Sequence, residues 1–279
     1  MRKRCLSMNK KKLWAGPYVI WAAGFILLPL IMVIYYALIA GDGTFTLSNL
    51  LAITDPIHYR AFGNSILIAF ISTVICLFIA YPLSLILSRV KGKNTDILIM
   101  VFVIPMWINF LLRILALQMI LSNTGILNAV LGVLGISPIH IMYSKTAIII
   151  GMVYDYLPFM ILPIYNALRR IDEDVIEAAR DLGADNFTTL TRILLPLSLP
   201  GVISGIIMVF IPSISEFVVA DILGGSKILL YGNVIDQEFN LSNNWNLGSG
   251  LSVVLMLFIF LSMAIMNHSG NGEEDMILW

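Results

Sequence analysis

Four ionisable residues interrupt stretches of the sequence that are otherwise apolar: Arg113, Asp155, Glu216 and Asp221. A charge at the centre of a membrane helix costs about 2.5–3.5 kcal/mol on insertion scales, so such residues usually face a protein interior or water. Three acids against one base leave a surplus of negative charge, which suits a cationic solute. The rings of Tyr154 and Tyr156 flank Asp155 and can stack on ammonium groups.

The same residues also have a structural interpretation, and the sequence leaves it open. Arg113 can pair with Asp155 or with Glu216, and the remaining acids can sit in wet interfaces. Glu216 and Asp221 are five residues apart, about 140° around a helix, so they need not share a face. Trp107 lies near the end of an apolar run, where aromatic residues commonly anchor helices at the membrane surface. The predicted pathway residues are Asp155, Glu216, Asp221, Tyr154 and Trp107.

The composition requires a membrane setting for these charges. The chain has 279 residues, of which 59% are hydrophobic and only 12% are charged, with a mean hydropathy of +0.91. Soluble domains carry about 25% charged residues. Basic and acidic residues balance at 17 each, so no global field favours nucleic acid. These figures exclude an ordinary soluble enzyme and predict an all-α polytopic membrane protein.

Six apolar stretches are long enough to cross the bilayer, which needs roughly 20 residues of helix. They define a transmembrane domain over 14–267, preceded by a basic tail (1–13) and followed by an acidic tail (268–279). The predicted spans are about 14–40, 62–88, 97–121, 145–168, 199–222 and 248–267.

The distribution of Lys and Arg predicts the orientation of these spans. The N-terminal tail carries six such residues, the loop after the second span three, and the loop after the fourth span four. The opposite side carries only Arg60, Lys145 and Lys227. The positive-inside rule therefore places both termini in the cytoplasm.

The loop 169–198 between the fourth and fifth spans is unusually informative. Asp174 can cap a short helix, with Glu177 as its capping-box partner. Gly183 stands where a left-handed C-terminal cap is expected. The apolar face of this predicted helix consists of Val175, Ala178, Ala179 and Leu182.

A second short helix is predicted to start at Asp185 and to end at Pro196, before the fifth span. The alternative to a protein-docking element is a helix lying in the membrane interface. The acidic residues of the loop disfavour anionic headgroups, so the loop is predicted to dock on a partner protein.

The same loop resembles the "EAA" signature of ABC importer permeases at every fixed position of that motif. The matching residues are Glu177, Ala178, Ala179, Gly183, Ile193, Leu195 and Pro196. The resemblance implies that the loop inserts into a cleft on a cytoplasmic ATPase. The implied coupling residues are Glu177, Ala178, Ala179, Arg180, Asp181 and Gly183.

A finer resemblance covers nearly the whole chain. The segments 215–225 and 231–239, with Leu157-Pro-Phe-Met160, are similar to spermidine/putrescine importer permeases of the B-type. This resemblance implies a second permease subunit forming a heterodimer, two copies of the ATPase and an extracytoplasmic solute-binding protein. Permeases for ferric ion, oxyanions or phosphonates share parts of these patterns and stay open as alternatives.

Several motifs are absent from the sequence. It has no GxxxxGK[ST] phosphate-binding loop, so ATP is expected to bind to partner ATPase subunits and no cofactor is expected in this chain. His58, His140 and His268 are far apart, so no metal site is predicted. No catalytic motif appears, so no enzyme activity is predicted. A secondary transporter is a less favoured alternative, because it has no partner ATPase on which the loop 169–198 could dock.

Overall fold

The computed structural model describes residues 17–18, 21–90 and 94–269, with only the backbone described for 94–96, 98–99 and 267–269. The predicted basic tail and all but the first two residues of the acidic tail lie outside this range. The described regular elements are all helical, apart from one isolated bridge between Ile39 and Phe45. The predicted all-α fold is therefore confirmed.

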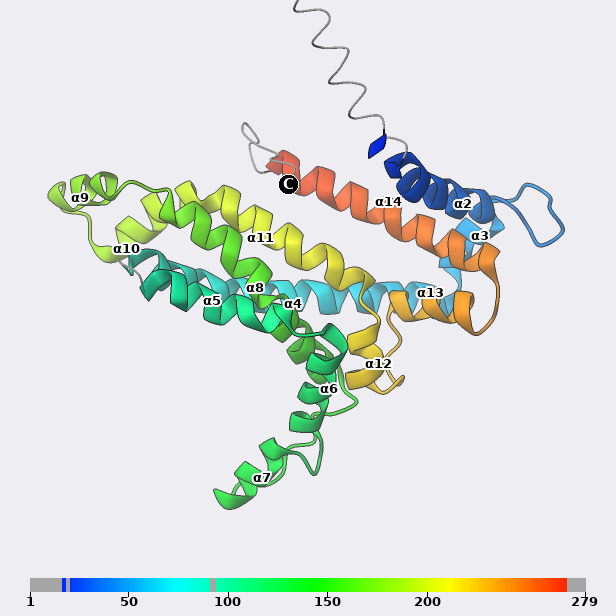
Figure 1. Ribbon diagram of the computed structural model, residues 1–279, viewed down its shortest axis with the longest axis horizontal. Coiled ribbons are helices and arrows are strands. Elements are labelled where there is room, and N and C mark those ends of the chain that lie inside the picture. The colour runs from blue at the N-terminus through cyan, green and yellow to red at the C-terminus, as the bar shows by residue number, and fades with distance from the viewer. Residues whose placement is uncertain (1–16, 19–20, 91–93, 270–279) are drawn as a thin grey trace, which may run out of the picture. The chain divides into compact units, whose positions relative to one another are not determined.

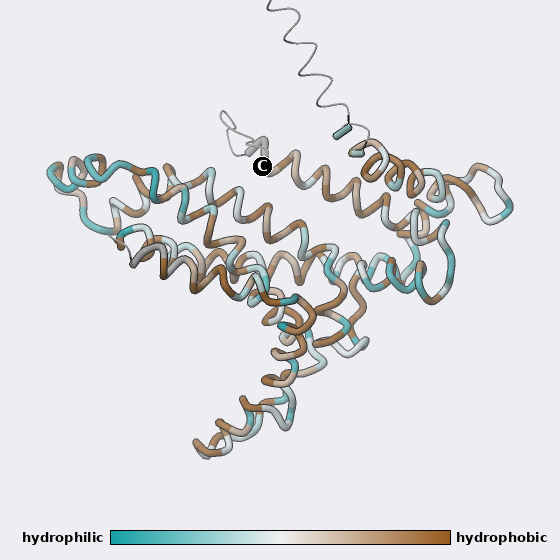
Figure 2. The backbone as a smooth tube through the Cα atoms, viewed as in Figure 1, coloured by the Kyte–Doolittle hydropathy of each residue, from teal (hydrophilic) through white to brown (hydrophobic). Residues whose placement is uncertain are grey.

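The helices divide into membrane-length segments and shorter connecting ones. In the described part of the chain, five segments are long and apolar enough to cross a membrane: Pro56–Arg89, Phe110–Val133, Lys145–Arg169, Asn186–Ser215 and Trp245–Met266. A shorter apolar helix covers Ala23–Ala37. Figure 2 shows these segments as largely hydrophobic and the short helix Glu173–Asp181 as largely hydrophilic.

The helices follow one another along the chain in a fixed order (Figure 1). They are the π-helical turn Ala23–Leu27, α2 (Leu28–Ala37), α3 (Ser48–Leu51), the 3-10 turn Ala52–Thr54, α4 (Pro56–Arg89), α5 (Asn94–Trp107), α6 (Phe110–Leu121), α7 (Ile126–Val133), α8 (Lys145–Arg169), α9 (Glu173–Asp181), α10 (Asn186–Thr189), the π-helical turn Leu190–Leu194, α11 (Leu195–Ser215), α12 (Val218–Gly224), α13 (Tyr231–Asn240) and α14 (Trp245–Ser269).

Two predicted spans are not single helices. The predicted span 97–121 is interrupted between α5 and α6, and the predicted span 199–222 is interrupted between α11 and α12. A proline precedes each interruption: Pro105 in α5 and Pro212 in α11. Because proline has no backbone N–H, the carbonyl four residues before each proline loses its helical hydrogen bond, which weakens the helix near the break. Polar side chains then complete each break, as described below.

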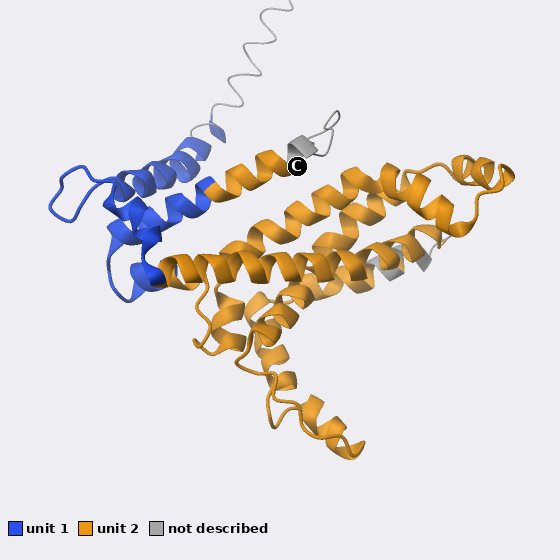
Figure 3. Cartoon of the chain, turned by 180° about the vertical axis from the view of Figure 1, so that it is seen from behind, with its two compact units in different colours: residues 1–56, 235–257 blue, residues 57–234, 258–279 orange. Residues whose placement is uncertain are grey.

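The chain forms two compact units, which Figure 3 colours separately. The first comprises residues 1–56 and 235–257. Within it, the Asn49 side chain donates to the carbonyl oxygens of Ala37 and Ile39, at 3.2 and 3.0 Å. The Asn246 side chain also donates to Ile39. These bonds join the end of α2 to α3 and to the start of α14.

The second unit, residues 57–234 and 258–279, contains two clusters of buried apolar side chains along α8. The first cluster joins the C-terminal half of α8 to α4 and α11, and the second joins its N-terminal half to α4, α6 and α12. The first consists of Cys76, Ala80, Leu87, Met160, Ile161, Ile164, Tyr165, Leu168, Leu194, Val202 and Val209. The second consists of Ile68, Ile114, Ala147, Ile148, Met152, Val219, Ala220, Leu223 and Leu230. Tyr156 packs against both.

Close packing of α11 against α8 depends on Gly201 and Gly205. A Cβ added at Gly201 would lie 2.5 Å from the Ala167 Cβ and 2.6 Å from the Pro163 carbonyl oxygen. A Cβ at Gly205 would lie 2.8 Å from the Met160 sulfur. The GxxxG spacing of these residues thus marks a real helix contact.

Gly201→Ala is expected to destabilise the protein by about 1–3 kcal/mol, because the added methyl overpacks the α8–α11 contact. Gly63→Ala in α4 is the matched control, since nothing lies within 4 Å of its added Cβ. That change should be neutral or stabilising, because alanine favours a helix over glycine. Thermal unfolding of the two purified variants measures the difference. Equal melting temperatures would contradict the packing argument.

Candidate functional site

The loop between α8 and α11 begins with a capped helix. Asp172 is the N-cap of α9, and its side chain accepts a hydrogen bond from the Asp174 backbone N–H at 3.2 Å. The predicted cap at Asp174, with Glu177 as its partner, is therefore wrong by two residues. The extended backbone at Asp172 starts the helix earlier, which places Glu173 and Asp174 in the first turn, where the helix dipole favours acids.

The C-terminus of α9 is closed as predicted at Gly183, which has a φ of +87°. The Gly183 N–H donates to the Arg180 carbonyl at 2.8 Å, and the Ala184 N–H donates to the Ala179 carbonyl at 3.0 Å. This pair of bonds is a Schellman motif, which requires a left-handed residue at the glycine position. The motif turns the chain sharply between α9 and α10.

Asp185 caps the second helix as predicted, and its side chain accepts from the Thr188 N–H at 2.8 Å. Hydrogen bonds from the Thr188 side chain and backbone hold the pKa of the Asp185 carboxyl below its ordinary value, so the cap is charged at neutral pH. The predicted end at Pro196 is wrong, because α10 continues through the π-helical turn into α11. Pro196 has no backbone N–H to donate. The wider π turn just before it lets the helix continue past this missing hydrogen bond.

The predicted apolar face of α9 is divided between the interior and the surface. Ala179 is buried, whereas Val175, Ala178 and Leu182 are exposed, Leu182 by 89%. Phe187 in α10 is exposed by 71%. The other predicted coupling residues, Glu177, Arg180, Asp181 and Gly183, are also exposed. Exposed apolar side chains among charged ones are typical of a surface that a partner protein covers.

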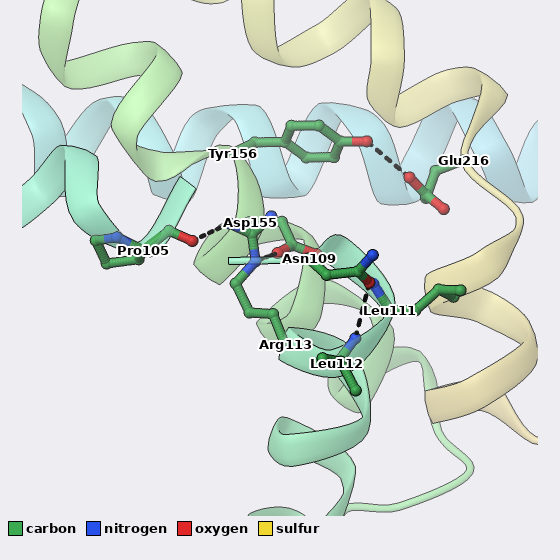
Figure 4. Close-up of polar contacts among 8 residues, drawn as sticks. All are labelled: Pro105, Asn109, Leu111, Leu112, Arg113, Asp155, Tyr156 and Glu216. Atoms are coloured by element: carbon green, nitrogen blue, oxygen red, sulfur yellow. Dashed lines mark hydrogen bonds and ion pairs between the residues drawn. The ribbon is translucent and has the colours of Figure 1, made fainter. Parts of the chain in front are cut away.

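A polar cluster lies beside the two helix breaks (Figure 4). The Arg113 Nε of α6 and the Asp155 Oδ1 of α8 form an ion pair at 2.5 Å, and the two side chains are 9% and 1% exposed. The Arg113 Nη1 also donates to the Pro105 carbonyl at 3.0 Å. Arg113 therefore pairs with Asp155 and not with Glu216, the other partner that the sequence left open.

The first break is completed by Asn109, which is the N-cap of α6. Its side-chain oxygen accepts from the backbone N–H groups of Leu111 and Leu112 at 2.9 and 3.3 Å. Arg113 supplies a donor to the carbonyl oxygen of Pro105 on the other side of the break. The interruption is therefore closed from both sides by polar groups.

The second break is completed by Glu216. Its Oε1 accepts from the backbone N–H groups of Val218 and Val219, at 2.9 and 3.2 Å, and so caps the start of α12. Its Oε2 accepts from the Tyr156 hydroxyl at 2.7 Å. Asp155 and Tyr156 are adjacent in α8, so a single turn of α8 carries a contact to each break.

The remaining predicted pathway residues lie around this cluster or apart from it. The Arg113 guanidinium lies 5.9 Å from the centre of the Tyr154 ring, which is 44% exposed. Trp107 ends α5 and is 75% exposed. Asp221 is exposed on α12, and its Oδ1 accepts from the Asn233 side chain at 2.7 Å.

Asn233 was assigned no role from the sequence, although it holds the α12–α13 connection together. Its Nδ2 also donates to the Phe217 carbonyl at 3.0 Å, and its Oδ1 accepts from the Leu230 N–H at 3.1 Å. Its sequence signal is weak, because other polar residues, among them Asp236, Gln237 and Glu238, follow it in α13. Among the described residues, no group of three His, Cys, Asp or Glu side chains could hold a metal ion.

Asp155→Asn is expected to destabilise the protein by about 3–5 kcal/mol, because it leaves the Arg113 charge buried without a counter-ion. The double change Arg113→Gln with Asp155→Asn removes both charges and should recover most of that loss. Thermal unfolding of the wild type, both single variants and the double variant forms a double-mutant cycle. Additive losses would show that the two groups do not interact.

Comparison with known proteins places these features in a family. Residues 80–272 match the family described as "Binding-protein-dependent transport system inner membrane component". The spermidine/putrescine transport system permease protein PotB of Haemophilus influenzae is 41% identical over 253 residues, covering 86% of this chain and 88% of that protein. PotB of Escherichia coli K12 is 37% identical, covering 88% and 92%.

Solved structures agree on the fold. A chain of a bacterial ABC transporter that imports the acidic polysaccharide alginate superposes with a TM-score of 0.76 at 16% identity, covering 97% of this chain and 98% of that one. A chain of the inward-facing MetNI methionine ABC transporter gives a TM-score of 0.54 at 19% identity, covering 78% and 97%. The chain is a polytopic membrane protein, and it belongs to the family of binding-protein-dependent transport system inner membrane components.

Proposed function

We propose that this chain is the permease subunit of an ATP-driven importer of polyamines, and that it forms half of the pathway for spermidine and putrescine. The observation that carries this proposal is the 41% and 37% identity, over most of the chain, to permeases named for these solutes. The geometry is compatible with a cationic solute. Glu216 receives hydrogen bonds only from neutral groups in the described part of the chain, so its charge is available to a cation.

The proposed assembly contains a second permease subunit in a heterodimer, two copies of a cytoplasmic ABC ATPase that bind the ATP, and an extracytoplasmic solute-binding protein. Both termini and the loop 169–198 face the cytoplasm in this proposal, following the distribution of Lys and Arg. The exposed apolar side chains of α9 and α10 support docking on the ATPase. The structural neighbours, both chains of ABC transporters, support the general form of the assembly.

The proposed mechanism begins at the loop. ATP closes the ATPase dimer, which moves α9, and the Schellman turn at Gly183 transmits that movement to α10. Because α10 continues without interruption into α11, the displacement reaches the Glu216 break at the far end of α11 (Figure 1). The helix breaks then allow α6 and α12 to move relative to α5 and α11, which exposes the pathway to the opposite side.

Uptake of radiolabelled putrescine and spermidine tests this function in cells that lack other polyamine importers. Deletion of this subunit should abolish uptake, and the wild-type chain should restore it while the partner subunits are present. Unchanged polyamine uptake after deletion would refute the substrate assignment. A pathway for oxyanions is disfavoured by the structure, because the buried base Arg113 is already paired with Asp155.

A further inference from the structure

The Arg113 guanidinium lies in a setting built for a cation. Besides the Asp155 carboxylate and the Pro105 carbonyl oxygen, two aromatic rings face it. The centres of the Phe110 and Tyr154 rings lie 6.0 and 5.9 Å from its central carbon. The site thus provides a carboxylate, a carbonyl oxygen and two aromatic faces around one positive group.

The same four groups would hold an alkylammonium. Carboxylate and carbonyl oxygens accept hydrogen bonds from N–H donors, and aromatic faces attract quaternary, primary and guanidinium cations alike. Asp155 also keeps an unused acceptor, since its Oδ2 has no hydrogen-bond partner among the described residues although the side chain is 1% exposed. A buried carboxylate oxygen without a donor indicates a site that can accept a further one.

The position of the site connects it to the pathway. Asp155 and Tyr156 lie on one turn of α8, between the two apolar clusters and next to both helix breaks. Tyr156 donates to Glu216, so a second carboxylate belongs to the same group of contacts. Two acids in one cluster match a solute that carries more than one ammonium group.

We propose that Arg113 is a tethered cation that fills an ammonium-binding site on Asp155, and that the transported polyamine displaces it from that site. This inference rests on the proposed function. Displacement breaks the ion pair between α6 and α8 and frees the Arg113 side chain from the Pro105 carbonyl, so binding of the solute itself would loosen the α5–α6 break. In the absence of solute, Arg113 keeps the buried acid neutralised and the two helices joined.

Equilibrium binding of labelled spermidine to the purified complete transporter in lipid nanodiscs, without the solute-binding protein, tests this proposal. Arg113→Gln should bind spermidine at least about tenfold more tightly than the wild type, because the competitor that occupies the site is gone. Arg113→Lys, which keeps a cation on the tether, should bind as weakly as the wild type. Lys227→Gln is the matched control, because Lys227 is an exposed cation near the Tyr143 ring and its removal should change nothing.

Arg113→Gln leaves a buried acid unpaired, so the assembly of that variant is checked by size-exclusion chromatography. If it does not assemble, the double variant Arg113→Gln with Asp155→Asn gives the answer, because it carries no unpaired buried charge. It should assemble and lose at least about tenfold in spermidine uptake, the effect of removing a charged hydrogen-bonding partner.

Unchanged binding by assembled Arg113→Gln, or wild-type uptake by the double variant, would overturn the tethered-cation proposal and leave a purely structural ion pair. Either result would leave the proposed function intact as long as the wild-type transporter takes up spermidine. Absence of spermidine and putrescine uptake by the wild type would instead overturn the proposed function. The two failures are therefore distinguishable in one set of samples.

Discussion

A transporter carrying Gly183→Val is expected to lose at least about tenfold of its ATP-driven uptake while the protein still inserts in the membrane and remains folded. The Gly183 backbone has a φ of +87°, and a β-branched residue is strained there by about 1–2 kcal/mol. A difference of about 1.4 kcal/mol is tenfold in an equilibrium. The strain opposes the Schellman turn that joins α9 to α10, so the coupling helix loses its fixed orientation.

Two matched variants separate the loss of coupling at Gly183 from the effect of backbone strain at any other left-handed glycine. Gly135→Val imposes similar backbone strain at a φ of +72° in the loop after α7, and as at Gly183 nothing lies within 4 Å of an added Cβ. It should retain most uptake. Gly183→Asn should retain more uptake than Gly183→Val, because asparagine tolerates the left-handed region. Normal uptake by Gly183→Val would refute the role of this turn in coupling.

Glu216→Gln is the second change with a large expected effect, a fall in uptake of about ten- to a hundredfold. The substitution removes the charge but preserves the local structure. The glutamine oxygen can still accept from the Val218 and Val219 N–H groups, and its amide can donate to the Tyr156 hydroxyl. A hydrogen bond to a charged group is worth about 1.5–3 kcal/mol, which corresponds to the stated range of uptake.

Tyr156→Phe provides the complementary control, because it removes the hydroxyl and keeps the Glu216 charge. It should reduce uptake less than Glu216→Gln does, if the charge rather than the hydrogen bond attracts the solute. Initial rates of spermidine uptake, normalised to the amount of assembled transporter, compare the two variants. A larger loss in Tyr156→Phe would show that the Tyr156–Glu216 hydrogen bond matters more for uptake than the Glu216 charge, and would contradict the proposed role of that charge.

The sequence predicts most of the coupling loop because its signals are local. A glycine after an amphipathic segment marks a left-handed cap, and Gly183 adopts that conformation. Asp185 likewise caps α10 as expected. The start of α9 was misplaced because Asp172 and Asp174 are equally good capping residues, and only the backbone conformation selects Asp172.

The helix breaks were harder to predict because hydropathy does not report them. Asn109 lies in an apolar run, and the polar residues near Phe217 (Ser213, Ser215 and Glu216) stand inside a stretch that is apolar on average. Asn109 is a favoured capping residue, so its signal was present in the sequence. Glutamate is not a favoured capping residue. Glu216 caps α12 only because the loop geometry at the break brings its carboxylate to the Val218 N–H.

The pairing of Arg113 with Asp155 could be anticipated only as one of two choices. The balance of charges requires a partner for a buried base, but the packing of α6 against α8 decides which acid lies within reach. The exposed position of Leu182 was also unexpected, because the helical pattern assigns it to the same face as Ala179. A face meant for a partner protein has the same apolar pattern as one meant for the core.

Uptake of labelled spermidine by proteoliposomes tests the central claim most directly. The vesicles contain this chain with its second permease and ATPase, with the solute-binding protein added on the side opposite the loop 169–198. The account predicts accumulation of spermidine toward the ATPase side that requires both ATP on that side and the solute-binding protein. Assembled vesicles that hydrolyse ATP but accumulate neither spermidine nor putrescine would contradict it.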